Sequence, residues 1–305
     1  MRNLLQIAWR RCPLILVVAS TSSCLFAQAG PPFRADDPET PGNGNWEINF
    51  GFIGDRNPQA GSYQTPDLDI NYGLGTRIQL KYDLPLTIAE TRQESGSGTS
   101  GSVLAGPGSS LLGMKIRFYE HHEQSAESGQ ANSGSVERPI DFSISTYPQF
   151  TLNNPTRSVA RGVVEPGPDF LLPLEMNGKL SPIRLAGEVG YHFGNDALAQ
   201  SWIRGLLIGH EFNDRLEAYL ELYDEQDANR IYSQSGDGSM VRLPKQRETT
   251  LGLGGRYGLN RSRSLVLLMM GGRSFQKVSV NNSQPSWIAY VGLQLRLEHM
   301  KQKNQ

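Results

Sequence analysis

The sequence predicts an all-β protein, a transmembrane antiparallel β-barrel of about 12 strands with up-and-down topology. Stretches in which apolar and polar residues alternate recur along the chain, and residues typical of turns separate them. The connections between these stretches alternate between short and long. Beyond the first thirty residues no apolar run is long enough to cross a bilayer as a helix, so a spanning chain would have to form a closed barrel.

The first 29 residues are predicted to be a signal peptide that is cleaved near Ala29, because three arginines precede a short apolar run and small residues follow it. Both cysteines, Cys12 and Cys24, fall in this segment, so the mature chain would contain no thiol. An alternative is a lipoprotein signal acylated at Cys24, although Thr21 stands where such signals usually have leucine. A signal peptide ahead of a barrel indicates the outer membrane of a Gram-negative-type bacterium.

Charge is nearly balanced, with 29 lysines and arginines against 30 acidic residues, and the basic residues are spread along the chain. This distribution argues against a nucleic-acid partner. The expected partners are outer-membrane lipids, the barrel-assembly machinery and a small-molecule solute.

The clearest strand pair lies between Asp67 and Leu84, where even-numbered positions are mostly apolar and odd-numbered positions mostly polar. Gly75 and Thr76 in the middle of this stretch predict a tight hairpin. With the less regular segments included, the predicted strands are 46–54, 66–74, 76–88, 109–119, 139–151, 168–177, 182–193, 201–211, 215–224, 247–258, 264–274 and 286–297. Most approach the roughly 9–11 residues that a tilted strand needs to cross a bilayer.

The connections follow the rule that outer-membrane barrels have short periplasmic turns at one rim and long loops at the other. Short links are predicted near residue 75 and at 178–181, 213–214 and 260–263, and long loops at 55–65, 89–108, 152–167, 225–246 and 275–285. The long link 120–138 departs from the rule. The predicted organisation is a signal peptide at 1–29, a periplasmic or lumenal lead segment at 30–45, the barrel at 46–297 and a polar tail at 298–305.

Charged residues of the inward-facing parity form the predicted lumen lining, and their mixed signs are typical of a hydrated interior with ion pairs. They are Arg77, Lys81, Lys115, Arg117, Arg184, Glu188, Glu217, Glu221, Arg256 and Arg296. They could form a constriction that selects solutes by charge and width, or only the polar filling that a barrel lumen has by default, which is the favoured interpretation.

Aromatic residues at or near the ends of the predicted strands are expected to anchor the barrel where the membrane meets water. They are Trp46, Tyr72, Tyr82, Phe118, Trp202 and Trp287. The core of a soluble β-sandwich would use the same aromatics, so they support the barrel without being specific to it.

No catalytic constellation is recognisable, and the protein is not expected to be an enzyme. No serine lies in a Gly-x-Ser-x-Gly motif, and Gly252, Gly254 and Gly255 lie within an alternating strand. His121 and His122 could chelate a metal, but neighbouring residues of an extended chain point in opposite directions, so a solvated loop is the better interpretation. Neither a metal nor a cofactor is expected.

Three motifs occur together along the mature chain: Pro31–Thr40 leading into Gly44–Asn49, then Ser110–Phe118, and finally Ile288–Gln294. In these motifs the sequence resembles the family of outer-membrane barrels associated with the MetA pathway of phenol degradation, which are often called transporters. The resemblance implies an outer-membrane location and passage of small apolar or aromatic compounds, and it implies no catalytic residues. The polar tail departs from the many barrels that end on an aromatic residue read by the assembly machinery.

The first functional hypothesis is therefore a channel or transporter that passes small solutes, with apolar or aromatic compounds as the finer expectation. The alternative is a barrel that anchors or presents loops without conducting, its bore blocked by the lead segment or by paired lumen charges. A lipid-modifying barrel enzyme is the third and least favoured hypothesis, because no serine and histidine pair is singled out by its spacing.

Overall fold

The structure, a computed structural model, describes residues 31–95, 98–122, 141–194, 200–228, 232–234, 240–242, 247–279 and 282–298. The predicted signal peptide, most of the 120–138 link and nearly all of the polar tail lie outside these ranges. Within them no helix has the length and apolar character of a membrane span.

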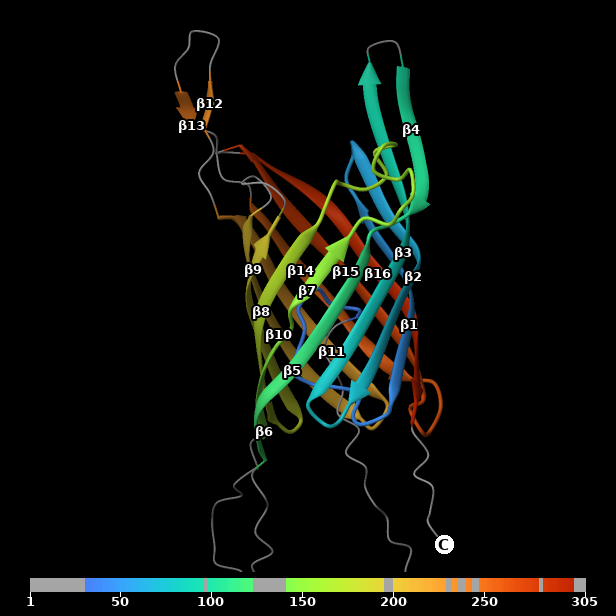
Figure 1. Ribbon diagram of the computed structural model, residues 1–305, viewed down its shortest axis with the longest axis vertical. Helices are drawn as coiled ribbons and strands as arrows, with labels where there is room; N and C mark the ends of the chain where they lie inside the picture. Colours follow the sequence, from blue (N-terminus) through green and yellow to red (C-terminus); the bar gives the residue numbers. More distant parts are fainter. Residues whose placement is uncertain are drawn as a thin grey trace, which may run out of the picture.

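The chain forms a closed antiparallel β-barrel of twelve strands, as predicted (Figure 1). Strands pair with their neighbours in sequence, and the last pairs with the first, with Trp46 opposite Leu297. The wall consists of β1 (Trp46–Arg56), β2 (Ala60–Leu74), β3 (Ile78–Ser95), β5 (Ser110–His122), β6 (Asp141–Thr146) with β7 (Gln149–Leu152), β8 (Asp169–Leu180), β9 (Ile183–Phe193), β10 (Ser201–Asn213), β11 (Leu216–Asp227), β14 (Arg247–Gly258), β15 (Leu265–Ser279) and β16 (Asn282–Leu297).

Two positions in the wall combine two strand segments. β4 (Gly98–Pro107) runs into β5 and pairs with the outer part of β3, so that β3 and β4 form a hairpin projecting beyond the barrel (Figure 1). β7 continues β6 after Tyr147 and Pro148, and both segments pair with β5 and β8. Because proline has no N–H to donate, the ladder is interrupted at this point.

The two ends of the barrel differ in their connections. We call the end with the short connections 75–77, 181–182, 214–215 and 259–264 the turn rim, and the opposite end the loop rim. Both the start of β1 and the end of β16 lie at the turn rim. By the rule for outer-membrane barrels, the turn rim corresponds to the periplasmic side.

Three of the predicted long loops are wrong, because the strands continue through them. The β1–β2 connection occupies only residues 57–59, β3 and β4 occupy most of 89–108, and β15 and β16 occupy most of 275–285. Beyond the membrane both faces of a strand meet water, so the alternation that marks a strand in a sequence disappears there. The predicted loop at 152–167 is free of strands after its first residue. The predicted loop at 225–246 begins with the end of β11 and contains the short pair β12 (Tyr232–Gln234) and β13 (Met240–Arg242).

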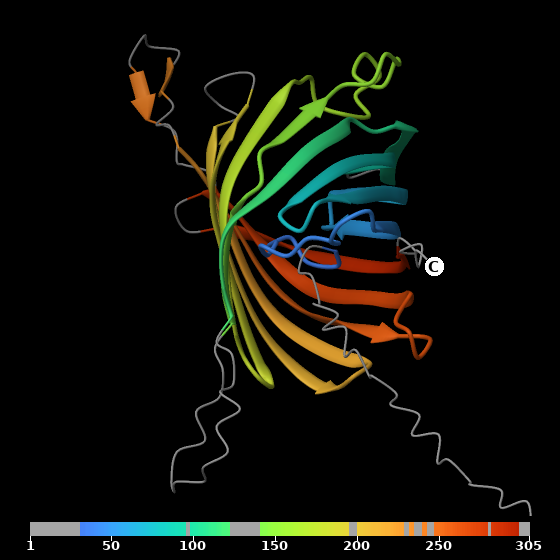
Figure 2. The ribbon, with the colours of Figure 1, turned by 60° about the horizontal axis from the view of Figure 1, so that its bottom comes forward.

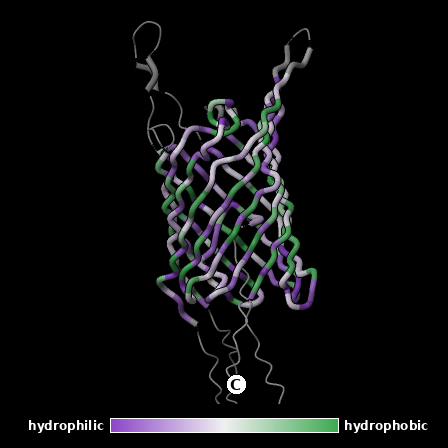
Figure 3. Tube along the Cα trace, turned by 45° about the vertical axis from the view of Figure 1, so that its right-hand side comes forward, coloured by the Kyte–Doolittle hydropathy of each residue, from purple (hydrophilic) through white to green (hydrophobic). Residues whose placement is uncertain are grey.

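Side chains alternate between the outer and the inner surface along each strand. On β1 the outward-facing Phe50 and Phe52 are exposed, whereas the inward-facing Glu47 and Asn49 are buried. Figure 3 shows the same alternation as changes between hydrophobic and hydrophilic colour along the strands. The outer surface is therefore apolar enough to face lipid, and much of the inner surface is polar.

Candidate functional site

Residues 31–45, which precede β1, lie inside the barrel (Figure 2). We call residues 31–45 the lumen segment. At the turn rim, hydrogen bonds from Gly44 N to Gly73 O (2.8 Å) and from Gly73 N to Asn45 O (2.9 Å) join it to the end of β2. A Cβ atom on Gly73 would collide with the carbonyl oxygen of Gly42, so this close approach requires glycine.

Backbone N–H groups of the lumen segment donate to carboxylates on the barrel wall. The N–H groups of Arg34 and Ala35 both donate to Glu221 Oε1, over 2.7 and 2.8 Å, and that of Asp36 donates to Glu188 Oε2 over 3.3 Å. Hydrogen bonds to a charged acceptor are stronger than those between neutral groups. The two glutamates therefore stabilise the segment through its main chain.

Lys115 of β5 is fully buried and joins the lumen segment to the opposite wall. Its Nζ lies 2.9 Å from Asp36 Oδ1 and 3.4 Å from Glu175 Oε2, and it also donates to the carbonyl oxygen of Asp37. The ammonium lies 4.7 Å from the centre of the Tyr147 ring, within the range of a cation–π contact. Removing this cation would leave two carboxylates without their shared partner.

A second ion pair lies nearer the turn rim. Glu39 accepts from Arg184 Nη1 over 2.6 Å and from Asn177 Nδ2 over 3.1 Å, and Arg184 also lies 3.3 Å from Glu211. Burial raises the pKa of Glu39 to about 7, with Asp37 acting in the same direction and Arg184 in the opposite one. The charge of this carboxyl is therefore sensitive to pH near neutrality.

Arg34 holds the part of the lumen segment that faces the loop rim. Its guanidinium lies 2.6 Å from Glu248 and 3.4 Å from Glu225, and 4.3 Å from the centre of the Tyr223 ring. Burial opposes the charge of Arg34, but Tyr223, Glu248 and Glu225 together raise its pKa. The arginine thus stays charged and bridges β11 and β14.

The apolar side chains of the lumen segment pack against apolar side chains inside the barrel. Phe33 lies with its ring centre 5.4 Å from that of Tyr219. The buried cluster comprises Phe33, Ala35, Ala186, Ile203, Leu207, Tyr219, Tyr223, Val266, Leu268, Met270 and Tyr290. The segment therefore has its own hydrophobic contacts with β9, β10, β11, β15 and β16 in addition to its polar ones.

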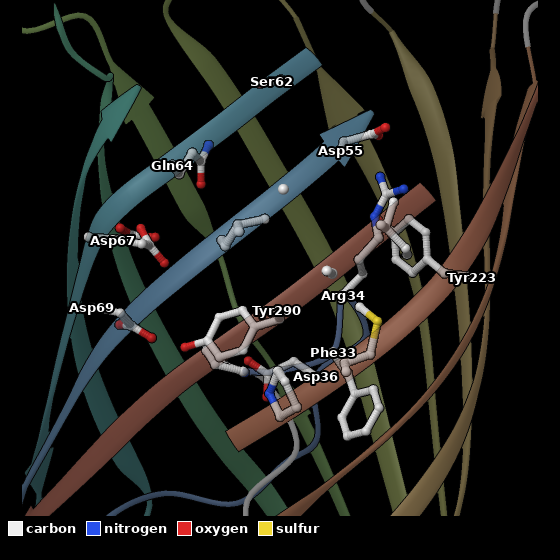
Figure 4. A pocket seen from close by; sticks show the side chains of 18 of the residues that line it. Phe33, Arg34, Asp36, Asp55, Ser62, Gln64, Asp67, Asp69, Tyr223 and Tyr290 are labelled. Atoms are coloured by element: carbon white, nitrogen blue, oxygen red, sulfur yellow. The ribbon is translucent and has the colours of Figure 1, made fainter. Parts of the chain in front are cut away.

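A cavity of about 470 Å³ lies on the loop-rim side of the lumen segment (Figure 4). One wall, formed by β1, β2 and β3, is acidic and carries Asp55, Asp67, Asp69 and Asp83 together with Lys81. Apolar side chains occupy other parts of the lining: Phe33 of the lumen segment, Leu171, Ile203 and Met270 of β8, β10 and β15, and Ile53 and Ile288 beside Asp55. The cavity is thus amphipathic, and the lumen segment forms part of its boundary.

Nine of the ten charged residues predicted to line the lumen lie inside the barrel, and the structure brings most of them into ion pairs or hydrogen bonds. Lys115, Arg117, Arg184, Glu188, Glu217, Glu221 and Arg256 are buried, and the side chains of Lys81 and Arg296 are nearly so. Arg77 lies exposed in the turn between β2 and β3, outside the interior. Lys81 pairs with Asp69 over 3.3 Å and Arg296 with Glu47 over 3.4 Å.

The predicted interface aromatics occupy different levels of the outer wall. Trp46 and Tyr72 lie at the turn rim with ring centres 4.6 Å apart, and Phe118 lies in the same end of β5. Trp202 lies at the loop-rim end of β10, and Trp287 lies in the loop-rim part of β16. Tyr82 lies further from either rim, paired with Ile70 and Leu112.

Two features of the interior were missed by reasoning from the sequence. The acidic residues Asp67, Asp69 and Asp83 have the inward parity but are absent from the predicted lumen lining. The apolar wall was also missed, although Leu265–Met270 is apolar at both parities, which signals a strand that is covered on both faces. Here the lumen segment supplies the second cover.

No protein-family model and no curated protein sequence matches this chain. Among solved structures, the COG4313 outer membrane channel from Pseudomonas putida F1 aligns with a TM-score of 0.56 and 13% identity over 86% of this chain and 98% of that chain. The KdgM porin aligns with a TM-score of 0.44 and 9% identity, over 83% and 100% of the two chains, and a TodX monoaromatic hydrocarbon channel mutant with 0.35 and 11%, over 85% and 92%. The first likeness establishes a shared fold, that of an outer-membrane barrel.

Proposed function

We propose that the protein is an outer-membrane channel that passes small solutes, with a path closed at the turn-rim half of the lumen by the lumen segment. The observation that carries the proposal is the cavity of about 470 Å³ enclosed by the barrel. Its volume falls within the range of about 300–1,000 Å³ that is typical of small-molecule sites. The lumen segment, held mainly by side chains and joined to the strands only by the backbone hydrogen bonds with Gly73, is the element that would have to move for a solute to pass.

Two further observations support this proposal. The barrel shares its fold with the COG4313 outer membrane channel, and the sequence motifs resemble a family of transporters associated with phenol degradation. Apolar or aromatic compounds are the finer expectation for the solute, because Ile203, Met270 and Ile288 give the cavity an apolar wall. The predicted signal peptide and the lipid-compatible outer surface support a location in the outer membrane.

Reconstitution of the mature chain tests the proposal. In a planar bilayer we expect discrete conductance steps, and in liposomes we expect uptake of phenol above that of protein-free vesicles. Protein left unfolded in urea and added in the same way is the control for leakage. Folded barrel, verified by a shift in gel mobility on boiling, that produces neither conductance nor uptake would contradict a channel.

A second candidate function, a barrel that does not conduct, is favoured by the buried ion pairs of Lys115 and Arg184 with the lumen segment. In that case the segment would be a permanent part of the core. The two functions differ in conductance. A segment that permanently plugs the barrel would allow no current at any applied voltage, whereas a channel would give conductance steps.

A further inference from the structure

We propose that the cavity binds small organic monocations, with an ammonium group against the acidic wall and an apolar or aromatic body against the apolar side chains of the lining. The inference names a solute class for the path proposed above and rests on that proposed function for its transport role. It is carried by the charge balance of the cavity, by buried polar atoms of its lining that have no partner, and by the apolar side chains that lie beside the carboxylates.

The cavity has a large excess of carboxylates. Its lining contains seven carboxylate side chains and two basic ones, Arg34 and Lys81. Arg34 is engaged by Glu248 and Lys81 by Asp69. No salt bridge reaches Asp67 or Asp83 in the part of the chain that the structure describes, so two inward carboxylates remain without a paired cation.

The acidic wall brings three carboxyl groups together on two neighbouring strands. Asp69 and Asp83 stand directly opposite each other on β2 and β3, and Asp67 lies on the same face two residues away. Like charges in directly opposed positions of a sheet destabilise it. Lys81 forms its salt bridge with Asp69, while the carboxyl groups of Asp67 and Asp83 share a hydrogen bond at the loop-rim end of this wall, where an ammonium group could replace the shared proton.

Two buried polar groups of residues that line the cavity have no hydrogen-bond partner. Tyr290 is 3% exposed and Asp67 is 4% exposed, and neither the Tyr290 hydroxyl nor Asp67 Oδ1 has a hydrogen-bond partner. Figure 4 shows the Tyr290 hydroxyl directed toward the side of the cavity where Asp69 lies. A buried polar atom without a partner costs free energy, and an ammonium group with three donors could satisfy several such acceptors at once.

The Tyr290 ring takes this position because the wall beneath it is made of glycine. A Cβ on either Gly51 or Gly292 would come within 3.0 Å of the ring or its hydroxyl. Two glycines on neighbouring strands therefore allow the ring to lie against the wall and leave the centre of the cavity free. The ring adds an aromatic face, which attracts organic cations.

The apolar part of the lining determines the rest of the ligand. Ile203, Met270 and Ile288 present apolar groups, while Phe33 from the lumen segment adds a second aromatic side chain. An ion such as sodium would gain nothing from these side chains, whereas the body of an arylalkylamine would bury apolar surface there. The predicted ligand is therefore a monocation with one apolar end.

Isothermal titration calorimetry on the mature barrel in detergent tests the inference, with 2-phenylethylammonium, 2-phenylethanol and phenylacetate as probes. These compounds share the apolar body and differ in charge. We expect the ammonium to bind about tenfold more tightly than the alcohol, and phenylacetate to bind more weakly still. The double variant Asp67→Asn, Asp83→Asn should reduce the ammonium to the affinity of the alcohol.

The matched control is Asp214→Asn, in the turn between β10 and β11, which should leave all three affinities unchanged. Equal affinities for the ammonium and the alcohol would overturn the inference. So would a preference for the ammonium that is undiminished in the double variant, provided that its heat-modifiable gel mobility shows that the variant is folded. Liposome uptake separates this result from the proposed function. Equal uptake of alcohol and amine would leave a channel without a cation site, and tight amine binding without uptake would leave a site without a channel.

Discussion

The two halves of the lumen are built from the same strands, yet one is filled and the other is hollow. In the turn-rim half, carboxylates face cations or backbone donors, as in Glu39 with Arg184, Asp36 with Lys115, and Glu217 with Arg263. In the loop-rim half, inward carboxylates stand over a cavity of about 470 Å³. The difference comes from the lumen segment, which completes the polar lining of one half and leaves that of the other incomplete.

Removal of the lumen segment should abolish the difference between the filled and the hollow half, and it has the largest expected effect, a change in conductance. A variant that lacks residues 31–42 loses the contacts of Arg34, Asp36 and Glu39, so its bore would be hydrated from rim to rim. We expect single-channel conductance to rise about tenfold, because a closed path becomes a water-filled one. The measurement is planar-bilayer recording.

The barrel wall does not depend on the segment for its strand pairing, since β1 closes directly on β16. The deletion variant should therefore keep its heat-modifiable gel mobility. Unchanged conductance in a variant that has this mobility would mean that the lumen segment does not close the path.

Loss of the buried cation at the boundary between the halves has the next largest effect. Lys115→Met leaves Asp36 and Glu175 without their shared partner, and breaking a buried ion pair by removal of one member costs about 3–5 kcal/mol. We expect the free energy of unfolding in urea to fall by an amount of this order. The control Lys277→Met removes an exposed lysine near the loop rim and should change it by less than about 0.5 kcal/mol.

The outer wall was predictable from the sequence and the inner surface only in part. Alternation such as that between Leu68 and Leu84 determines which side chains face lipid, and a period of two survives wherever the two faces meet different solvents. Strand ends beyond the membrane have water on both faces, and the inner surface of β15 is covered by another part of the same chain. Local alternation cannot report either situation.

The interaction partners of the predicted lumen charges could not be predicted from the sequence, because they too depend on contacts between distant parts of the chain. The parity of Glu221 and Glu188 predicts that they face inward, but the backbone N–H groups from which they accept hydrogen bonds belong to residues more than 150 positions away. Only closure of the barrel brings these residues together. Sequence patterns thus indicated which side chains point inward, and tertiary structure decides what each of them meets.

The close contact between Gly205 and Ala35 allows the lumen segment to be displaced by a single substitution in the barrel wall. A Cβ on Gly205 would lie 2.5 Å from the Cβ of Ala35, so Gly205→Ala should displace the segment at a cost of about 1–3 kcal/mol. Because the mature chain is predicted to contain no cysteine, Pro38→Cys provides a single thiol whose rate of maleimide labelling reports the displacement.

Two matched variants make this prediction specific. Gly187→Ala adds a methyl group that meets only ordinary van der Waals contact, and labelling should stay slow. Adding Ala35→Gly to Gly205→Ala removes the clash and should restore the original labelling rate. Fast labelling that persists in the double variant would show that the wall itself, and not the contact with Ala35, had been disturbed.

The smallest expected effect is a dependence of the filled half on pH through Glu39. The pKa of Glu39 is about 7 when the segment is docked and should return to the ordinary value of about 4.3 when it is released. Because the pKa of Glu39 is higher in the docked state, docking of the segment is accompanied by uptake of a proton. The stabilisation of the docked state that comes from this proton is fully present below pH 4 and is lost as pH rises through 7. Labelling of a cysteine introduced by Pro38→Cys should therefore accelerate between pH 6 and pH 8, by up to about tenfold after correction for thiolate formation.

The matched control is Glu39→Gln combined with Pro38→Cys. This variant keeps a hydrogen-bonding side chain beside Asn177 but cannot titrate at position 39, so its corrected labelling rate should not change over this range. A rate that still rises with pH in this variant would assign the dependence to another group, and the filled half would then be held independently of the charge of Glu39.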